Sequence, residues 1–164
     1  MKKLILATVL LIGTYVSQAQ SRSAHGTDYE NALGVKIWDG GGITFKHFIS
    51  PNHAVEGIGY FYNGGFRLTG LYEIHGDING APGLKWYVGP GAHIGFYNDK
   101  YYRYRNIVYS NNGAVFGIDG VVGLDYKFNG APINVSLDWQ PAFEFASGFG
   151  FNGSWGGLGI RYTF

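Results

Sequence analysis

From residue 31 onward, apolar and polar side chains alternate in short segments that are separated by Gly, Asn and Pro. This period of two predicts β-strands, because successive side chains of a strand point to opposite faces of its sheet. In the last segment, residues 157–164, the even positions are apolar and the odd positions are Gly, Arg or Thr. We count eight such segments, and the first three, at about 31–38, 42–50 and 54–62, alternate least regularly.

Alternation alone fits a soluble barrel with an apolar interior and a membrane barrel with an apolar exterior. Three features favour the membrane barrel. The polar faces are rich in glycine, which suits a narrow lumen. The segments run to about 9–13 residues, and a tilted membrane strand needs about 9–11. The apolar faces carry large aromatic residues near segment ends, as in interfacial girdles. These are Phe66, Trp86, Phe96, Phe116, Trp139, Phe143, Trp155 and Phe164. The pattern therefore predicts an all-β, eight-stranded antiparallel up-and-down transmembrane β-barrel.

Composition supports β structure and excludes several kinds of chemistry. Glycine occupies 28 of 164 positions. Few helical proteins contain so much glycine, because it destabilises helices, whereas turns, bulges and barrel strands use it freely. The chain has no cysteine, so disulfides, thiol catalysis and Cys-ligated metals are excluded. The net charge of +1 does not indicate a nucleic-acid partner.

The amino-terminal segment has the pattern of a secretory signal peptide. Lys2 and Lys3 precede an apolar run from Leu4 to Ile12, and Ser17-Gln18-Ala19 is a small-x-small cleavage site. The run is about half of the roughly 20 apolar residues that a spanning helix needs. We expect residues 1–19 to be a cleaved signal, 20–30 a lead-in and 31–164 the barrel.

The connections between segments alternate in length, which predicts an orientation, because outer-membrane barrels have short periplasmic turns and longer external loops. The connections around Pro51, 77–83 and 129–132 are expected to be periplasmic. The tetrapeptide Asn-Gly-Ala-Pro occurs in two of them, at 79–82 and 129–132.

The chain ends in Gly-Ile-Arg-Tyr-Thr-Phe, which resembles the carboxyl-terminal targeting strand of outer-membrane proteins. This resemblance implies that Ile160, Tyr162 and Phe164 form a membrane-insertion signal for the barrel-assembly machinery. The mature chain resembles small barrels of the OmpX and OmpA-transmembrane type. The segments 42–48, 70–73 and 86–93 resemble uncharacterised outer-membrane barrel proteins of Bacteroidota. The resemblance implies the cell outer membrane of a Gram-negative bacterium, with outer-membrane lipid and lipopolysaccharide as neighbours, but no settled activity.

The predicted lumen face collects six basic and six acidic residues. An eight-stranded interior is just wide enough for side chains to fill it, and unpaired buried charge is costly. We therefore expect a balanced ion-pair network, with a narrow ion path as the alternative. Its members are Lys36, Lys46, Glu56, Arg67, Glu73, Lys85, Asp119, Asp125, Lys127, Asp138, Glu144 and Arg161.

A lipid A-modifying enzyme is a second alternative, because small barrels can carry a His, a Ser and a carboxylate near the membrane surface. The candidates are His47, His75, His93, Ser110, Ser147 and Ser154. A nucleophile needs a base within hydrogen-bond reach, and no Gly-x-Ser-x-Gly elbow occurs. We therefore assign no catalytic residue, metal or cofactor. The glycine pattern at 148–153 matches a dinucleotide fingerprint only formally, since no helix can follow it.

Segment 100–105 interleaves three cations with three tyrosines in the longest expected external loop. Lys100, Arg103 and Arg105 could contact lipopolysaccharide phosphates through charge-assisted hydrogen bonds; an ordinary solvated rim is the alternative. We expect a structural or surface-interaction role, with a narrow transport barrel for small or apolar solutes as an alternative to it.

Overall fold

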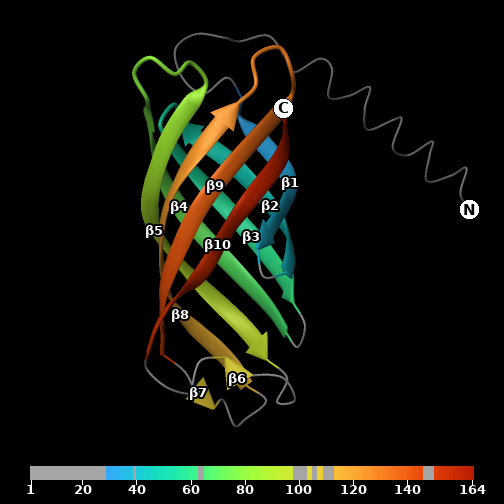
Figure 1. Ribbon diagram of the computed structural model, residues 1–164, viewed down its shortest axis with the longest axis vertical. Helices are drawn as coiled ribbons and strands as arrows, with labels where there is room; N and C mark the ends of the chain where they lie inside the picture. Colours follow the sequence, from blue (N-terminus) through green and yellow to red (C-terminus); the bar gives the residue numbers. More distant parts are fainter. Residues whose placement is uncertain are drawn as a thin grey trace, which may run out of the picture.

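The computed structural model describes residues 29–38, 40–62, 65–97, 103–104, 107–108, 113–145 and 150–164. Eight strands close into an antiparallel barrel in the order β1-β10-β9-β8-β5-β4-β3-β2 (Figure 1). They are β1 (Asn31–Trp38), β2 (Gly40–Ser50), β3 (His53–Tyr62), β4 (Gly65–Asp77), β5 (Leu84–Tyr97), β8 (Gly113–Lys127), β9 (Ile133–Glu144) and β10 (Gly150–Thr163). The predicted all-β, eight-stranded antiparallel barrel is confirmed.

Two short strands that the sequence pattern did not predict lie outside the barrel. β6 (Arg103–Tyr104) and β7 (Ile107–Val108) form a separate two-stranded sheet between β5 and β8. Strands of two residues carry no periodicity to detect. Within the described residues, no helix is long and apolar enough to cross a membrane.

The two ends of the barrel differ, and we name them by what they carry. The carboxyl end holds Phe164 and the turns at 51–52, 78–83 and 128–132, whereas β6 and β7 lie at the opposite end (Figure 1). Asn31 and Phe164 exchange two backbone hydrogen bonds of 2.8 Å, which close β1 against β10 at the carboxyl end. The repeated tetrapeptides form two of the turns, and their glycines have φ angles of 81° and 75°, which favour glycine.

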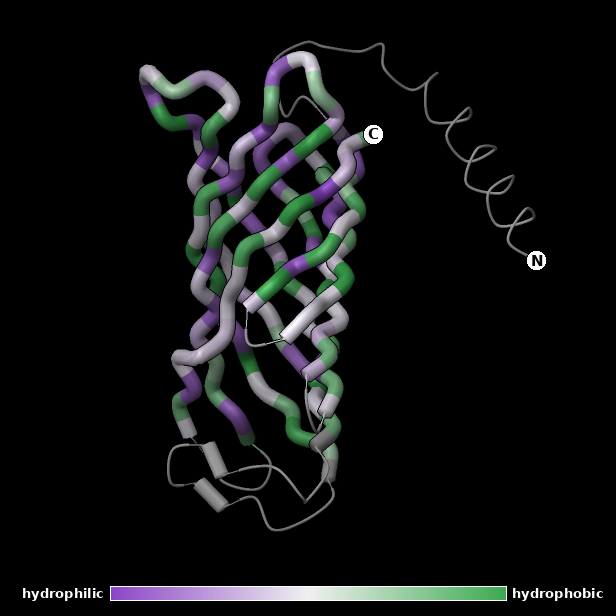
Figure 2. Tube along the Cα trace, turned by 45° about the vertical axis from the view of Figure 1, so that its right-hand side comes forward, coloured by the Kyte–Doolittle hydropathy of each residue, from purple (hydrophilic) through white to green (hydrophobic). Residues whose placement is uncertain are grey.

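Inward and outward side chains have opposite polarity. Along the strands, purple hydrophilic and green hydrophobic positions alternate (Figure 2). Arg161 and Glu73 are buried, whereas Ile118 and Leu137 are each 55% exposed although they are large and apolar. The barrel is therefore polar inside and apolar outside, the reverse of a soluble protein.

Inward glycines make the lumen narrow enough for side chains to fill it. A Cβ atom on Gly123 would lie 2.6 Å from Cζ of Tyr87 and 2.7 Å from the carbonyl oxygen of Leu137. On Gly159 it would lie 2.6 Å from Oγ of Ser136. These glycines leave room in the lumen for the side chains of the residues paired with them on neighbouring strands, Tyr87 and Ser136.

The expectation that Trp155 belongs to the outer aromatic girdle is wrong. A bulge shifts the β10–β9 register between Asn152 and Trp155, and such an extra residue changes which face a side chain takes. Trp155 packs inside, with its ring centroid 5.4 Å from that of the buried Tyr60. Phe151, on the other side of the bulge, is 57% exposed.

Candidate functional site

The centre of the lumen holds one connected cluster of charged side chains, all fully buried or nearly so. Nζ of Lys46 lies 2.7 Å from a carboxylate oxygen of Glu73 and 3.4 Å from oxygens of both Glu56 and Asp125. Nζ of Lys36 lies 2.5 Å from Asp138. Of the twelve predicted lumen residues, ion pairs bring together the cations Lys36, Lys46 and Arg161 and the carboxylates Glu56, Glu73, Asp125 and Asp138.

Arg161 uses every nitrogen of its guanidinium. Nη2 lies 2.5 Å from Glu56, Nη1 donates to Ser136 at 2.7 Å and to Asn134 at 3.2 Å, and Nε donates to Thr44 at 3.3 Å. A buried charge is tolerated when its hydrogen bonds are satisfied in this way. This one side chain connects residues of β2, β3 and β9 to β10.

Neutral polar groups that the sequence reasoning did not include complete the cluster. The Tyr87 hydroxyl donates to Asp138 at 2.5 Å, and Nε2 of Gln140 donates to Asp138 at 2.8 Å. Asn134 donates to Asp125 at 2.5 Å. The alternation along β5 and β9 predicts that Tyr87, Gln140 and Asn134 point inward. They were not included because the predicted network was selected by charge.

A second, smaller cluster lies toward the opposite end. Arg67 and His93 both bind the carboxylate of Asp119, His93 through Nδ1 at 2.8 Å. Nε of Arg67 donates to Thr69 at 3.1 Å, and its guanidinium carbon lies 4.2 Å from the ring centroid of Trp155. The described lumen is thus divided into two charged layers.

Lys85 and Lys127, two of the twelve predicted lumen residues, have their partners outside both clusters. Lys85 pairs at 2.6 Å with Asp77, whose side chain is 78% exposed, at the carboxyl end. Nζ of Lys127 donates to the backbone carbonyls of Phe128 and Ala131 in the adjacent turn. Both lysines lie at strand ends, where the side chain reaches out of the lumen.

Glu144 is buried and accepts a hydrogen bond of 3.1 Å from Asn152.

Two histidines that the predicted network did not include point into the lumen. His75 bonds Glu73 at 2.8 Å, as His93 bonds Asp119. The described lumen therefore contains four buried Lys and Arg side chains, six buried carboxylates and these two histidines.

At the carboxyl end, aromatic rings cover the charged cluster. Phe48 makes an edge contact with Tyr29 at a centroid distance of 5.1 Å and lies 4.8 Å from His75. His75 stacks on Tyr87 at 5.1 Å, and Nζ of Lys46 lies 4.3 Å above the Tyr87 ring. This end of the lumen is closed by packing rather than by ion pairs.

The third candidate histidine, His47, and a further histidine, His53, lie outside the lumen at the carboxyl end. His47 bonds Asn31 at 2.9 Å, and His53 bonds the Tyr72 hydroxyl at 2.9 Å. In the described part of the chain, no hydrogen bond joins a serine hydroxyl to a histidine, and no group of three His, Cys, Asp or Glu side chains could hold a metal. Ser110 and Ser147 lie outside the described residues.

The residues of the expected insertion signal line one outward row of β10. Ile160 is 46% and Tyr162 45% exposed, and the ring of Phe164 stacks at 6.2 Å on that of Tyr162. The expected lipopolysaccharide contact cannot be described in the same way: Lys100 and Arg105 lie outside the described residues, and Arg103 is placed only as backbone in β6. The expected signal, residues 1–19, also lies outside them.

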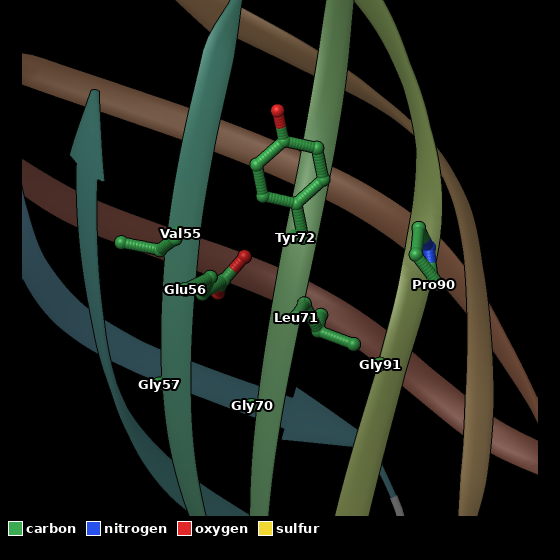
Figure 3. Close-up of a pocket in the computed structure, with 8 residues that line it drawn as sticks. All are labelled: Val55, Glu56, Gly57, Gly70, Leu71, Tyr72, Pro90 and Gly91. Atoms are coloured by element: carbon green, nitrogen blue, oxygen red, sulfur yellow. The ribbon is translucent and has the colours of Figure 1, made fainter. Parts of the chain in front are cut away.

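A shallow apolar depression crosses β3, β4 and β5 on the outer wall. Its volume is about 540 Å³, and Figure 3 shows Tyr72 and Pro90 beside the bare backbone of Gly57 and Gly70. Pro90 has no N–H group, and the regular pairing of β4 with β5 is interrupted between Leu71 and Ile74. The complete lining is Val55, Glu56, Gly57, Gly70, Leu71, Tyr72, Pro90 and Gly91.

Together, the fold and the site define a closed eight-stranded antiparallel barrel with a charged, side-chain-filled lumen and an apolar outer wall. In comparison with known proteins, no family model, no curated protein and no solved structure matches the chain.

Proposed function

We propose that this protein is an integral outer-membrane β-barrel with a structural or surface-interaction role, and that its lumen does not serve as an open channel. The observation that carries the proposal is the inverted distribution of polarity. Lys36, Lys46 and Arg161 are at most 1% exposed, whereas Leu137, Ile118 and Ile43 are at least 55% exposed. Large apolar surface is unfavourable in water and favourable in lipid.

The closed strand order supports a membrane environment as well. In hydrocarbon every backbone polar group needs an internal partner, and a barrel without edges supplies one. Each of the eight strands pairs with a neighbour on both sides. A soluble eight-stranded barrel can close in the same way, so it is the apolar outer wall that favours the lipid alternative.

Aromatic rings at both ends of the outer wall support the proposal too. Phe61 and Phe66 stand beside the β3–β4 connection at the opposite end, with ring centroids 5.1 Å apart. Tyr126 and Phe128 stand beside the turn at the carboxyl end, 4.8 Å apart. Membrane barrels place such rings at the two lipid–water interfaces.

A charge on the outer wall tests the membrane proposal. Ile118 lies near the middle of β8 and points outward. Ile118→Lys should lower the unfolding free energy in phospholipid vesicles by about 2–4 kcal/mol, as for lysine at the bilayer midplane. Asn129→Lys, in an exposed turn, is the matched control and should change it by less than about 0.5 kcal/mol. If Ile118→Lys is as harmless as the control and the protein folds without lipid or detergent, the membrane proposal is wrong.

The filled lumen supports the absence of a wide pore. The central cluster has partners from facing strands, so it occupies the axis of the barrel. Purified protein in planar bilayers should show no large steady conductance, and a reproducible wide opening would contradict this part of the proposal. In cells, fractionation should recover the chain in the outer membrane, with the carboxyl end of the barrel facing the periplasm.

We propose a non-enzymatic role, and lipid A provides the test of the enzymatic alternative. His75 and His93 are buried inside the lumen and bond carboxylates, so they point away from lipid on the outer wall. Mass spectrometry of lipid A from cells with and without the protein should show the same acyl pattern. A changed pattern would instead favour a lipid A-modifying enzyme.

A further inference from the structure

We infer that Tyr29, which belongs to the lead-in and not to a barrel strand, is the plug that closes the lumen at the carboxyl end. Tyr29 lies two residues before β1, yet its side chain is only 9% exposed. Its ring meets Phe48 edge-on, with an interplanar angle of 89°. Its hydroxyl donates to Asp125 of the central cluster at 3.4 Å.

Backbone hydrogen bonds fix the lead-in at the rim of the barrel, where they continue the pairing of β1 with its neighbours. The carbonyl oxygen of Glu30 accepts from the N–H of Phe48 at 2.8 Å, and the N–H of Asn31 donates to the carbonyl of Phe164 at 2.8 Å. The first bond joins the lead-in to β2, and the second joins the first residue of β1 to the residue that follows β10. The Tyr29 ring is thereby directed inward.

The barrel wall leaves space for this ring at the same level. Ala32 of β1 and Ala54 of β3 are both fully buried, and they form one apolar cluster with Tyr29 and Phe48. Two alanines, on the strands that flank β2, cannot fill an eight-stranded lumen, whereas an aromatic ring can. The lumen at this level is therefore completed by a residue that the strands do not contain.

Withdrawal of the Tyr29 ring would open a path from solvent to the charged side chains of the central cluster. Beyond Tyr29 lie Asp125 and Lys46, which are paired at 3.4 Å, and Glu73, which lies 2.7 Å from Lys46. Water and small hydrophilic solutes that pass the vacated position would reach these groups from the carboxyl end. The two-layered lumen keeps the effect local, because the Arg67–Asp119 cluster lies toward the opposite end.

The absence of cysteine from the chain makes a direct accessibility experiment possible. The reporter is Ala54→Cys in the otherwise unchanged protein, folded in detergent and treated with a charged methanethiosulfonate reagent. Adding Tyr29→Ala should raise the rate of labelling about tenfold or more, because thiol reactivity depends on access. Adding Tyr29→Phe, which keeps the ring and removes the bond to Asp125, should leave the rate close to that of the reporter alone.

Two controls keep the result specific. With Thr69→Cys, a reporter in the buried lumen wall beside Arg67, Tyr29→Ala should not change the rate. Tyr162→Ala, an outward ring at the carboxyl end, should not change labelling of Ala54→Cys. Heat-dependent gel migration verifies that each variant is folded, and Ala32→Cys replaces the first reporter if that one does not fold.

An unchanged labelling rate in folded Tyr29→Ala would contradict the proposal that Tyr29 is the plug. An equal rise in the rates of Ala54→Cys and Thr69→Cys would contradict it as well. The first result would mean that the strands seal the lumen alone, and the second would mean general loosening of the barrel. The experiment is carried out in detergent and reports only on the lumen, so its outcome is independent of the proposed location in the outer membrane.

Discussion

Arg161 of β10 and Glu56 of β3 bring their side chains to 2.5 Å inside the barrel, although β1 and β2 lie between their strands in the barrel order. The ion pair therefore crosses the lumen instead of following the wall. Glu56 also lies 3.4 Å from Lys46 and 3.8 Å from Lys36. One carboxylate thus faces three cations from three strands, which makes it the centre of the described lumen.

Breaking this pair should destabilise the protein strongly. Glu56→Gln and Arg161→Gln should each lower the unfolding free energy by about 3–5 kcal/mol, because each leaves a buried charge without its main partner. The double variant should cost less than the sum, by about 0.5–3 kcal/mol of coupling. Urea titrations in vesicles measure all three. Asp77→Asn at the exposed Asp77–Lys85 pair should cost at most about 1 kcal/mol, and equal costs at both sites would contradict the central role of Glu56.

The narrow lumen predicts opposite outcomes for two glycines. Gly123→Ala should destabilise the barrel by about 1–3 kcal/mol, because the new methyl group overlaps the Tyr87 ring and the backbone of β9. Gly57→Ala meets nothing within 4 Å and points outward, so it should be neutral or slightly stabilising. The same unfolding titration compares them. Equal tolerance of both substitutions would mean that the lumen is wider than described.

The carboxyl-terminal strand should govern assembly more than final stability. Phe164→Ala removes the terminal ring of the outward row that Ile160 and Tyr162 begin, so folded protein in the outer membrane should fall severalfold in cells. The same variant, purified and refolded in detergent, should retain heat-dependent gel migration. Phe151→Ala, another exposed ring on β10, is the control and should assemble normally. Equal loss in both variants would argue against a terminal signal.

The basic segment beyond β5 predicts an interaction with lipopolysaccharide. Replacing Lys100, Arg103 and Arg105 together with alanine should weaken association in detergent, because each phosphate contact loses a charge-assisted hydrogen bond. Co-purification of lipopolysaccharide with the wild-type and triple variant measures the change. Lys127→Ala removes a cation whose Nζ is engaged by a turn at the other end and serves as the control. Unchanged association in the triple variant would reject the contact.

The alternation of residues predicted most of the fold and the membership of the lumen, because the face that a strand residue takes is a local property. Lys36, Glu56 and Arg161 are buried as their phase requires. The prediction of inward and outward positions was wrong where a strand is not regular or where it ends. At Trp155 a bulge changes the register, and at Lys85 and Lys127 the strand end lets a long side chain reach out of the lumen.

The sequence by itself determined that the chain forms strands with a polar and an apolar face and that charged residues share the polar one. It could not determine which charges meet. That depends on the closure and stagger of the barrel, which bring Glu56 opposite Arg161 across two intervening strands. It depends also on a lead-in residue with no strand periodicity, Tyr29, which enters the lumen only because β1, β2 and β10 meet beside it. Contacts between strands that are distant in the chain depend on the register in which the strands pair around the barrel. The alternation of residues predicts the face of each side chain but not this register.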